Sequence, residues 1–251
     1  MGGLARYNKY GNLGTTEGRR KGGLNSLKTH QKRNTGFKVL RKVKQPMHTM
    51  EYAELLGILF GDGHLSYYQA TITTNAETDV FHARYVVALC TKVFNIKPSL
   101  TFRKDSNACT VTLNSRRVCD YIEGEGLARG NKLTHGLKIP LWITSDKVFS
   151  RAFARGLFDT DGCVFLDRHE IKGIKYYNAG LGFASKSPEL LQFFTDTLHS
   201  IDCHPTQTTP YRVFLRRAKE IDIYFKIIGS SNPKHLNRYH TYLGQIKGGV
   251  A

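Results

Sequence analysis

The sequence predicts an α+β protein made of two similar halves behind a basic N-terminal arm. Two observations carry this prediction. Tyr52–Ser66 (YAELLGILFGDGHLS) and Arg151–Phe165 (RAFARGLFDTDGCVF) share small residues and an Asp-Gly pair at a constant offset of 99 positions. The segments after each copy run through strand-like and helix-like patterns in the same order. We therefore expect an N-terminal extension over 1–50, a first repeat over 51–145 and a second repeat over 146–251.

Composition favours a globular protein that binds nucleic acid. The 251 residues carry 37 Lys and Arg against 20 Asp and Glu, a net charge of +17, and 40% are hydrophobic, enough for a core. Such a charge indicates a polyanionic partner. A membrane is not expected, because the chain lacks a spanning segment, a basic amphipathic helix and a signal peptide. We expect an intracellular protein, in the cytoplasm or nucleoid of a prokaryote or in an organelle, and not a secreted one.

The cysteines predict no disulfide framework. There are five, an odd number, without a C-x-x-C pair, and most lie in apolar patterns, so we expect reduced core residues. His199, Cys203 and His204 are close in sequence but lack a second pair of ligands, so zinc is not expected there.

The N-terminal extension is a basic arm. Its 50 residues hold 12 Lys and Arg and one acid, Glu17, so +11 of the net charge lies there. It has too little apolar surface to fold alone, and only Leu24–Lys32 is expected to form a short helix. Two interpretations stay open. The arm is a solvated tail, or it lies along DNA phosphates and enters a minor groove, with Arg19, Arg20 and Lys21 among its contacts.

Each repeat opens with a helix and continues as β-β-α-β-β-α. In the first repeat we expect strands at 70–75, 99–105 and 108–114 and helices over 78–95 and 115–124. In the second repeat we expect strands at 163–170, 175–185, 204–210 and 211–217 and helices over 187–201 and 218–228.

The two opening helices carry small residues at every fourth position, which places them on one helix face. These residues are Ala53, Gly57 and Gly61 in one copy and Ala152, Gly156 and Thr160 in the other. Such a face lets two backbones approach closely, so each helix is the natural partner of the other. Parallel packing then brings Asp62 and Asp161 together.

Two carboxylates at two helix C-termini repel each other and face the negative ends of both helix dipoles. A cation must offset them, and Mg²⁺ prefers carboxylates, carbonyls, waters and phosphate oxygens. One acid for each strand of a duplex would suit metal-assisted phosphodiester hydrolysis. For a single Asp-Gly pair, a turn that ends the helix is the simpler interpretation, but the duplication favours the metal site.

The two copies resemble a known family. LLGILFGDG (Leu55–Gly63) and ARGLFDTDG (Ala154–Gly162) are similar to the signature motifs of the LAGLIDADG homing endonucleases, in the single-chain form with two repeats. GLKIPLWI (Gly136–Ile143) and SSNPKHLNRY (Ser230–Tyr239) also resemble segments common in that family. The resemblance covers residues 51–245 and implies the LAGLIDADG fold, two pseudo-twofold αββαββα repeats whose antiparallel sheets form a saddle over DNA.

The resemblance also implies a metal-dependent DNA endonuclease. Such an enzyme makes a double-strand break in a long, non-palindromic site, leaves short 3′ overhangs and acts as a monomer built like a dimer. It would use two or three Mg²⁺ ions, with Mn²⁺ or Ca²⁺ able to substitute for binding. By position, the catalytic and metal-binding acids are Asp62 and Asp161, helped by the carbonyls of Gly61 and Thr160.

The sixth motif position departs from the pattern, with Phe60 in one copy and Asp159 in the other. We expect Asp159 to lie on the helix surface or to cap a helix, outside the catalytic pair. The family also has basic residues beside the metals. The best candidates follow the fourth strand of each repeat, and two lysines in the similar segments GNK and SNPK rank below them: Arg116, Arg117, Arg216 and Arg217, then Lys132 and Lys234.

A sheet that grips DNA needs polar side chains on one face and apolar ones toward its helices. Hydroxyl, amide and basic groups are suited to reading base edges in the major groove. In the first repeat the candidates are Tyr67, Tyr68, Gln69, Thr71, Thr73, Asn75, Thr101, Arg103, Lys104, Asn107, Thr110, Thr112 and Asn114. In the second repeat they are Arg168, His169, Lys172, Lys175, Tyr177, Asn178, Gln207, Thr208, Tyr211 and Arg212. For any single residue, a solvated strand face is the alternative.

Proteins with three other functions could use the same scaffold. An RNA maturase that assists splicing of its own intron would use the basic surface on RNA and could keep both acids, so it stays open as an alternative. A transcription regulator derived from a nuclease is not expected, because it would lose an acid and gain a helix-turn-helix, and the sequence shows neither change. An intein is not expected from a sequence that begins MGGL and ends KGGVA.

Overall fold

The structure is a computed structural model that describes residues 8–9, 14–33, 35 and 43–248. The chain divides into two units, an arm (Met1–Lys42) and a larger unit (Val43–Ala251). Each unit is described by itself.

The arm contains helix α2 (Thr16–Arg33), which has no buried residue and is longer than the expected Leu24–Lys32. The shorter helix was expected because the first half of α2 contains several glycines, which disfavour helix formation. The hydroxyl of Thr15 caps this end by accepting a hydrogen bond from the Gly18 amide at 3.0 Å. An acid in the first turn and basic residues in the last turn also favour the helix dipole.

The larger unit confirms the predicted α+β class with two αββαββα repeats. The first repeat contains α3 (Met50–Asp62), β1 (Gly63–Leu65), β2 (Gln69–Asn75), α4 (Val80–Phe94), β3 (Ser99–Phe102), β4 (Ala108–Asn114) and α5 (Arg116–Gly124), followed by the short α6 (Lys132–His135) and α7 (Leu141–Thr144). The second contains α8 (Lys147–Asp161), β5 (Gly162–Ile171), β6 (Ile174–Ala184), α9 (Pro188–His199), β7 (Thr206–Thr209), β8 (Arg212–Leu215), α10 (Ala218–Ile227) and α11 (Pro233–Gly248).

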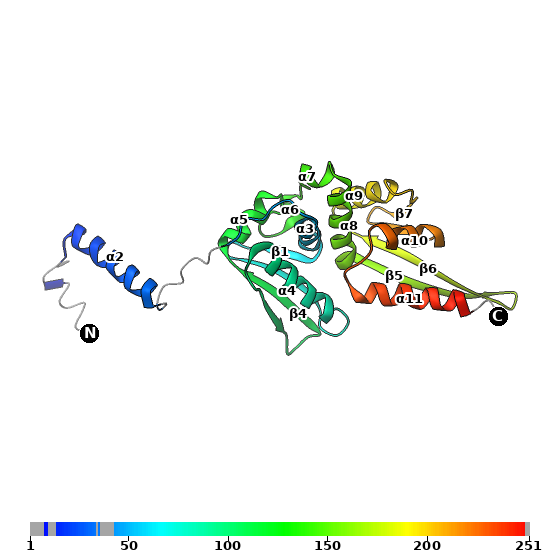
Figure 1. Cartoon of the computed structure of the whole chain (residues 1–251), viewed down its shortest axis with the longest axis horizontal. Helices are drawn as coiled ribbons and strands as arrows, with labels where there is room; N and C mark the ends of the chain where they lie inside the picture. The colour runs from blue at the N-terminus through cyan, green and yellow to red at the C-terminus, as the bar shows by residue number, and fades with distance from the viewer. Residues whose placement is uncertain (1–7, 10–13, 34, 36–42, 249–251) are drawn as a thin grey trace. The chain divides into compact units, whose positions relative to one another are not determined.

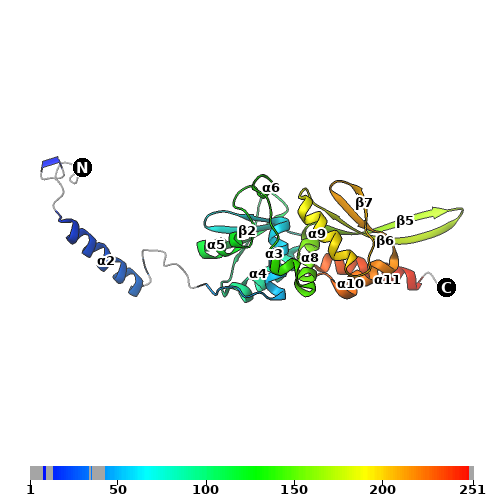
Figure 2. The same ribbon diagram turned by 90° about the horizontal axis from the view of Figure 1, so that it is seen from above.

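Each repeat forms one antiparallel four-stranded sheet, in the order β1-β2-β4-β3 and β5-β6-β8-β7. The two sheets lie on either side of the central helices α3 and α8 (Figure 1). Helices α4 and α5 pack on the first sheet, and α9, α10 and α11 pack on the second. Figure 2 shows the strands along one side of the unit and α4, α10 and α11 along the other. We call the sheet face away from the helices the outer face.

The two sheets differ in their first hairpin. Strands β1 and β2 pair over only three residues each, from Gly63 with Ile72 to Leu65 with Ala70. Strands β5 and β6 pair over ten, ending at a tight turn where Lys172 and Gly173 have positive φ angles of 52° and 81°. The outer face of the second sheet therefore extends much further along its hairpin.

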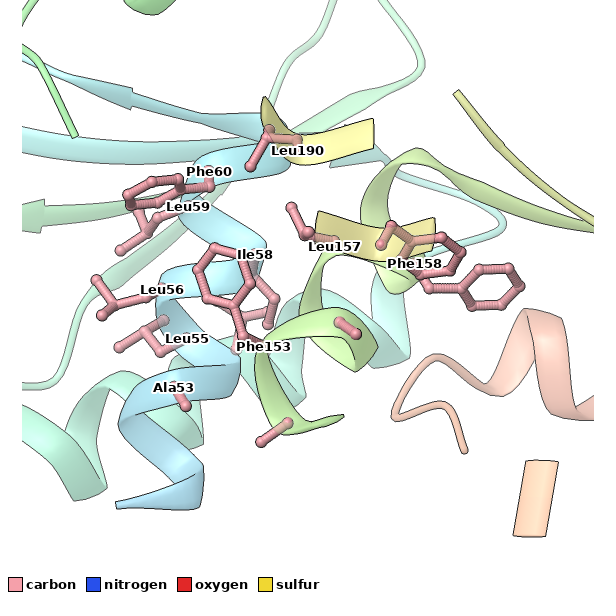
Figure 3. Close-up of a cluster of buried hydrophobic side chains, with 14 of the residues drawn as sticks. Ala53, Leu55, Leu56, Ile58, Leu59, Phe60, Phe153, Leu157, Phe158 and Leu190 are labelled. Atoms are coloured by element: carbon pink, nitrogen blue, oxygen red, sulfur yellow. The ribbon is translucent and has the colours of Figure 1, made fainter. Parts of the chain in front are cut away.

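Helices α3 and α8 form the centre of the core (Figure 3). All residues of α3 from Leu55 to Phe60 are buried, including Gly57, which has no side chain. The rings of Phe60 and Phe153 meet edge to face at 5.3 Å between centroids, joining the two helices. Burial of each such side chain stabilises the fold by about 1.5–3 kcal/mol, so the helix pair anchors both repeats.

Two expectations about single elements need correction. Cys90, Cys109, Cys119 and Cys203 are buried as predicted, but Cys163 is exposed, because it alternates with the buried Val164 on β5. Helix α11 was also missed, although its start has a recognisable signal. Pro233 is its first residue, and the Asn232 side chain accepts a hydrogen bond from the Lys234 amide at 3.1 Å.

Within the described residues, no helix is both long and apolar enough to cross a membrane.

Candidate active site

Glycines bring α3 and α8 into backbone contact. A Cβ added at Gly57 would overlap the carbonyl oxygen of Phe153, and one at Gly156 would overlap the carbonyl oxygen of Glu54. A Cβ at Gly61 would overlap the Thr160 hydroxyl. The contacts advance together along both helices, so the two run parallel and end side by side. The predicted close packing of the small faces is confirmed.

The parallel ends bring Asp62 and Asp161 into one electrostatic environment. Asp161 lies close enough to α3 that a Cβ at Gly61 would stand 3.0 Å from its Oδ2. Desolvation and then the neighbouring Asp62 carboxylate raise the pKa of Asp161 to about 7. Desolvation also raises the pKa of Asp62, where Lys132 opposes the shift and Asp79 adds to it. The pair has the unfavourable charge that the sequence predicted, and it needs positive charge nearby.

Lys132 supplies part of that charge. Its ammonium donates to carbonyls at the end of α3, at 2.9 Å from the oxygen of Phe60 and closer still to that of Gly61. It also lies 3.3 Å from the carbonyl oxygen of Gly63, the first residue of β1. Desolvation lowers the pKa of Lys132, while Asp161 and Asp62 oppose that shift. An ammonium therefore sits on the carbonyl that the motif predicts as a metal ligand.

A second lysine approaches from the other repeat. The Lys234 ammonium lies 2.8 Å from Oδ1 of Asp79, the N-cap residue of α4, which also accepts a hydrogen bond from Asn232 at 2.8 Å. Burial opposes ionisation of Asp79, but these two donors outweigh it and lower its pKa. The charge of Lys234 also acts to lower the pKa of Asp62. The two acids of the motif thus have unlike surroundings, because only Asp62 has this extra ion pair near it.

Asp159 does not lie on a helix surface. It is 2% exposed and accepts hydrogen bonds from the Ser230 hydroxyl and from the Ser231 amide, the latter at 2.8 Å. The Asp159 carbonyl accepts another from Asn232 at 3.2 Å. Asp159 therefore anchors the segment before α11, which places Lys234. The part of the expectation that kept Asp159 out of the acid pair agrees with this position.

A buried ion pair also joins the two helices, and the sequence analysis missed it. Arg155 of α8 lies 2.5 Å from Oε2 of Glu54 of α3, which is 2% exposed. The hydroxyls of Tyr85 and Ser231 donate to the other oxygen of Glu54, at 2.8 and 2.6 Å. The sequence did contain a signal for this pair, because Glu54 and Arg155 are charged residues at otherwise apolar positions of the two helices.

The donor set at the helix ends fits a divalent cation. Two carboxylates and the Gly61 carbonyl are hard oxygen ligands of the kind that Mg²⁺ prefers, and the Lys132 ammonium already binds there as a cation. No group of three or more His, Cys, Asp or Glu side chains able to hold a metal occurs in the described part of the chain. A metal at this site would therefore need carbonyls and outside ligands to complete its shell.

A cavity of about 710 Å³ opens beside Asp161. First-repeat residues at the acid pair, including Gly61 and Lys132, line one side, and Lys186 and Arg212 of the second repeat line the other. Asp161 is thus reachable through this cavity, next to Arg212 of the second sheet.

The four arginines expected beside the acids have other surroundings. Arg116 pairs with Asp120 at 3.9 Å, and Arg217 pairs with Glu220 at 2.9 Å. Arg117 is exposed on α5, and Arg216 lies over aromatic rings of the second sheet. The lower-ranked lysines are the ones whose charges act on Asp62 and Asp161. The similarity of GNK to SNPK predicted the basic residues near the acids better than the position after the fourth strand did. Both segments lie near the C-terminal ends of the motif helices.

In the first repeat, the strand candidates share one outer face. The core side holds Ala70, Ile72, Val111 and Leu113, all at most 3% exposed. The opposite positions are the predicted ones, with cross-strand hydrogen bonds between Gln69 and Asn114 and between Thr73 and Thr110. Other predicted residues on this face or at its turns are Tyr67, Tyr68, Thr71, Asn75, Thr101, Arg103, Lys104, Asn107 and Thr112. His64, opposite Thr71, was missed.

The second repeat is more mixed. Register places His169 and Asn178 on the outer face, whereas Arg168 and Tyr177 share the face of the buried Val164 and Leu181. The side chain of Lys175 lies outside the described residues. The remaining candidates are exposed on the hairpin turn, β7 and β8: Lys172, Gln207, Thr208, Tyr211 and Arg212. The long hairpin's alternation was assigned to the wrong face in part, because both faces look polar beyond the core.

The arm candidates Arg19, Arg20 and Lys21 are exposed on α2. They point around the helix and not to one side, since successive residues turn by about 100°.

Part of the chain matches a family model, and the fold has similar solved structures. Residues 148–237, from the start of α8 to the start of α11, match the family model described as LAGLIDADG-like domain. A variant of I-SmaMI has a similar structure, with a TM-score of 0.50 at 8% identity over 74% of this chain and 88% of that one. I-DmoI in complex with DNA and Mn scores 0.48 at 17% identity, over 72% and 97%.

A curated relative shares sequence over part of the chain. The replication factor C small subunit of Methanocaldococcus jannaschii is 29% identical over 138 residues, 49% of this chain. The chain spans only 7% of the length of that relative.

Two parallel helices ending in paired acids, between two four-stranded antiparallel sheets, define a pseudo-twofold LAGLIDADG architecture. The family match over the second repeat confirms the resemblance found in the sequence. The family model covers the second repeat, and the first repeat shares its strand order and its motif helix.

Proposed function

We propose that the protein is a site-specific homing endonuclease that cuts both strands of a long, non-palindromic DNA duplex and leaves short 3′ overhangs. The observation that carries the proposal is the acid pair. Asp62 and Asp161 end two helices in backbone contact, and the Asp62 charge helps to raise the pKa of Asp161 to about 7. A structural role would not require two like charges side by side at the ends of two helices, one of them lining a cavity.

In this proposal Asp62 and Asp161 hold divalent cations, Mg²⁺ above all, with the Gly61 and Thr160 carbonyls as helpers. A bound cation would stabilise the added negative charge on the phosphate and assist attack by water. Each acid serves one strand of the duplex. Lys132 and Lys234 lie beside the pair and contribute positive charge toward the same phosphates. Binding of DNA and metal would draw the Lys132 ammonium away from the Gly61 carbonyl.

The two outer faces would bind one DNA half-site each. Because their side chains differ, the two half-sites should differ in sequence, which suits a monomer that reads a non-palindromic site. The arm is proposed to bind phosphates outside the core site through its basic side chains. Removal of residues 1–42 should then flatten the salt dependence of binding, by about 0.9 log units in slope for each phosphate that the arm neutralises.

The test is cleavage of a randomised duplex library in Mg²⁺, with recovery of cut molecules and of their ends. Asp62→Asn and Asp161→Asn should each lower double-strand cutting on the order of 100-fold or more, because each removes a charge at the metal site. Asp222→Asn is the matched control, since Asp222 pairs with Lys226 on α10 at 3.4 Å. Cutting that survives in both site variants, or without divalent metal, would contradict the proposal.

A further inference from the structure

Two phenylalanines and an arginine form a cluster on the outer face of the second sheet. The rings of Phe165 on β5 and Phe214 on β8 meet edge to face, with 6.1 Å between centroids and 79° between planes. The guanidinium carbon of Arg216 lies 5.2 Å from the Phe214 centroid and 5.8 Å from the Phe165 centroid. We call these three residues the Arg216 platform.

Glycines on the intervening strand make this arrangement possible. Strand β6 runs between β5 and β8, with Gly180 opposite Phe165 and Gly182 opposite Phe214. A Cβ at Gly180 would overlap the Phe165 ring, and one at Gly182 would stand 3.1 Å from the Phe214 ring. Both rings therefore reach over β6, into the space that side chains at Gly180 and Gly182 would fill. Their orientation is fixed by the sheet, and the arginine above them is held in turn by cation–π attraction.

The first sheet, whose four strands all fall within the described part of the chain, has no such arrangement at the matching place. Its central cross-strand pairs are Thr71 with Thr112 and Thr73 with Thr110, hydroxyl groups on both strands. An aromatic pair at this place is therefore not a requirement of the fold.

Within the part of the chain that the structure describes, Arg216 also lacks the carboxylate partner that several other arginines have. Arg116, Arg129, Arg155 and Arg217 each pair with a carboxylate. Among the described residues, no acid forms an ion pair with Arg216. Its guanidinium keeps its donors for a ligand, while stacking removes much of the rotational freedom that binding would otherwise cost.

From this geometry we infer that the Arg216 platform is a specificity-determining site that reads one guanine in the major groove of the second half-site. The inference rests on the proposed function insofar as the outer faces bind duplex DNA. Arg216 donates two hydrogen bonds to O6 and N7 of the guanine, a pairing that the rigid guanidinium fork matches. The exposed parts of the Phe165 and Phe214 rings contact an adjacent apolar group, such as the methyl of a thymine.

The competing role for Arg216 is a phosphate contact, which carries no sequence information. The two roles differ in measurable ways. Loss of a guanine contact relaxes preference at one base pair, whereas loss of a phosphate contact weakens all sequences alike and lowers the salt slope by about one.

The experiment is binding selection from a randomised duplex library with the full chain in Ca²⁺, followed by affinity measurements on the selected site. Arg216→Gln should reduce discrimination for guanine at a single position by roughly 5- to 150-fold and leave other positions as they were. Arg216→Lys keeps the charge but loses the planar fork, so it should also lose most of that discrimination while the salt slope stays the same. Phe214→Leu should give a smaller loss at the same position and its neighbour.

Arg84→Gln is the matched control. Arg84 lies 5.8 Å over the ring of Phe81 on helix α4, so it is also an arginine on a phenylalanine, but away from both outer faces. It should leave the selected sequence unchanged.

Two results would overturn the inference. One is a uniform loss of affinity in Arg216→Gln with a lower salt slope, and the other is an unchanged preference at every position. Failure of the proposed function looks different, because the selection measures binding without cleavage. A protein that selects a sequence, loses one guanine preference in Arg216→Gln and never cuts DNA in Mg²⁺ would support the platform and reject the endonuclease.

Discussion

The two repeats share a frame but differ on the surfaces that the frame presents. Both contain a motif helix, a four-stranded antiparallel sheet in the same strand order and helices on one face. The first outer face is built of threonine, asparagine and glutamine around a three-residue hairpin. The second carries aromatic rings on glycines and a ten-residue hairpin. Close packing therefore limits which residues can occupy the buried side of both repeats. The outer side is not packed in this way, so its residues can differ between the repeats.

The helix interface shows the same contrast in its charges. Positions 99 residues from Glu54 and Arg155 are Phe153 and Leu56, so the buried ion pair occurs once and not twice. The lysines at the acids are also unequal, since Lys132 sits on backbone carbonyls and Lys234 on Asp79. The pseudo-twofold relation thus holds for the backbone and the two acids, and breaks in the polar groups around them.

The largest expected effect comes from breaking the single ion pair. Arg155→Met should destabilise the protein by about 3–5 kcal/mol, because it leaves the Glu54 carboxylate buried without its countercharge. The free energy of unfolding is measured by denaturant titration of the full chain. The double variant Glu54→Leu with Arg155→Met should recover most of the loss, since it removes both buried charges and gives both positions apolar side chains, as at the matching positions Phe153 and Leu56. A loss under about 1 kcal/mol in the single variant would mean that the ion pair is not part of the interface energy.

The next effect concerns one buried histidine in each repeat. Burial lowers the pKa of His82 from 6.5 to about 4 and that of His235 to about 3. Each is therefore neutral in the folded state at neutral pH. Their stabilising effect is complete above pH 6.5 and is lost as the pH falls toward 4, because the unfolded state then binds more protons.

His82→Gln should reduce the fall in unfolding free energy between pH 6.5 and 4 by up to about 3 kcal/mol, whatever its effect at neutral pH. His235→Gln should also reduce the fall in unfolding free energy at acid pH. The two variants together compare the acid sensitivity of the two repeats. The measurement is the midpoint of denaturation at several pH values. An acid-side slope that neither substitution changes would show that other groups control it.

The smallest of the three effects tests the backbone contact that both repeats share. Gly57→Ala should cost about 1–3 kcal/mol, because its Cβ would strike the backbone of Phe153. Gly244→Ala, also within a helix, has no described atom within 4 Å of the new Cβ and should stabilise by roughly 0.5–1 kcal/mol. Thermal unfolding of both variants compares them. Equal effects in the two would reject close helix approach as the reason for glycine at position 57.

Much of the fold could be predicted from the sequence, because its signals are local and repeated. Alternation gave the faces of β2 and β4 correctly, since Ala70 and Ile72 are buried and Thr71 and Thr73 are not. Spacing of small residues predicted the contact of α3 with α8. The prediction was weaker where both faces of a strand are polar, as at Arg168 on the long hairpin, and where a cap outweighs poor helix formers, as at Thr15.

The candidate site was predicted in its acids and not in its surroundings. Asp62 and Asp161 followed from one offset, but the lysines, Asp79 and the segment before α11 come from elements distant in sequence. No local sequence pattern predicts that Lys234 contacts Asp79 at the N-terminus of α4. Arg216 was assigned a charge role by its place after β8, whereas its contacts with two rings depend on the strand order β5-β6-β8.

By itself, the sequence determined the two repeats, the helix pair and the acids at its end, because periodic burial and close backbone approach depend on residue types at fixed spacings. Only the tertiary structure decided which cations meet those acids, where Asp159 is buried and how Phe165, Phe214 and Arg216 come together. Those contacts join segments that are up to about 170 residues apart, and their geometry exists only after both sheets have packed on α3 and α8.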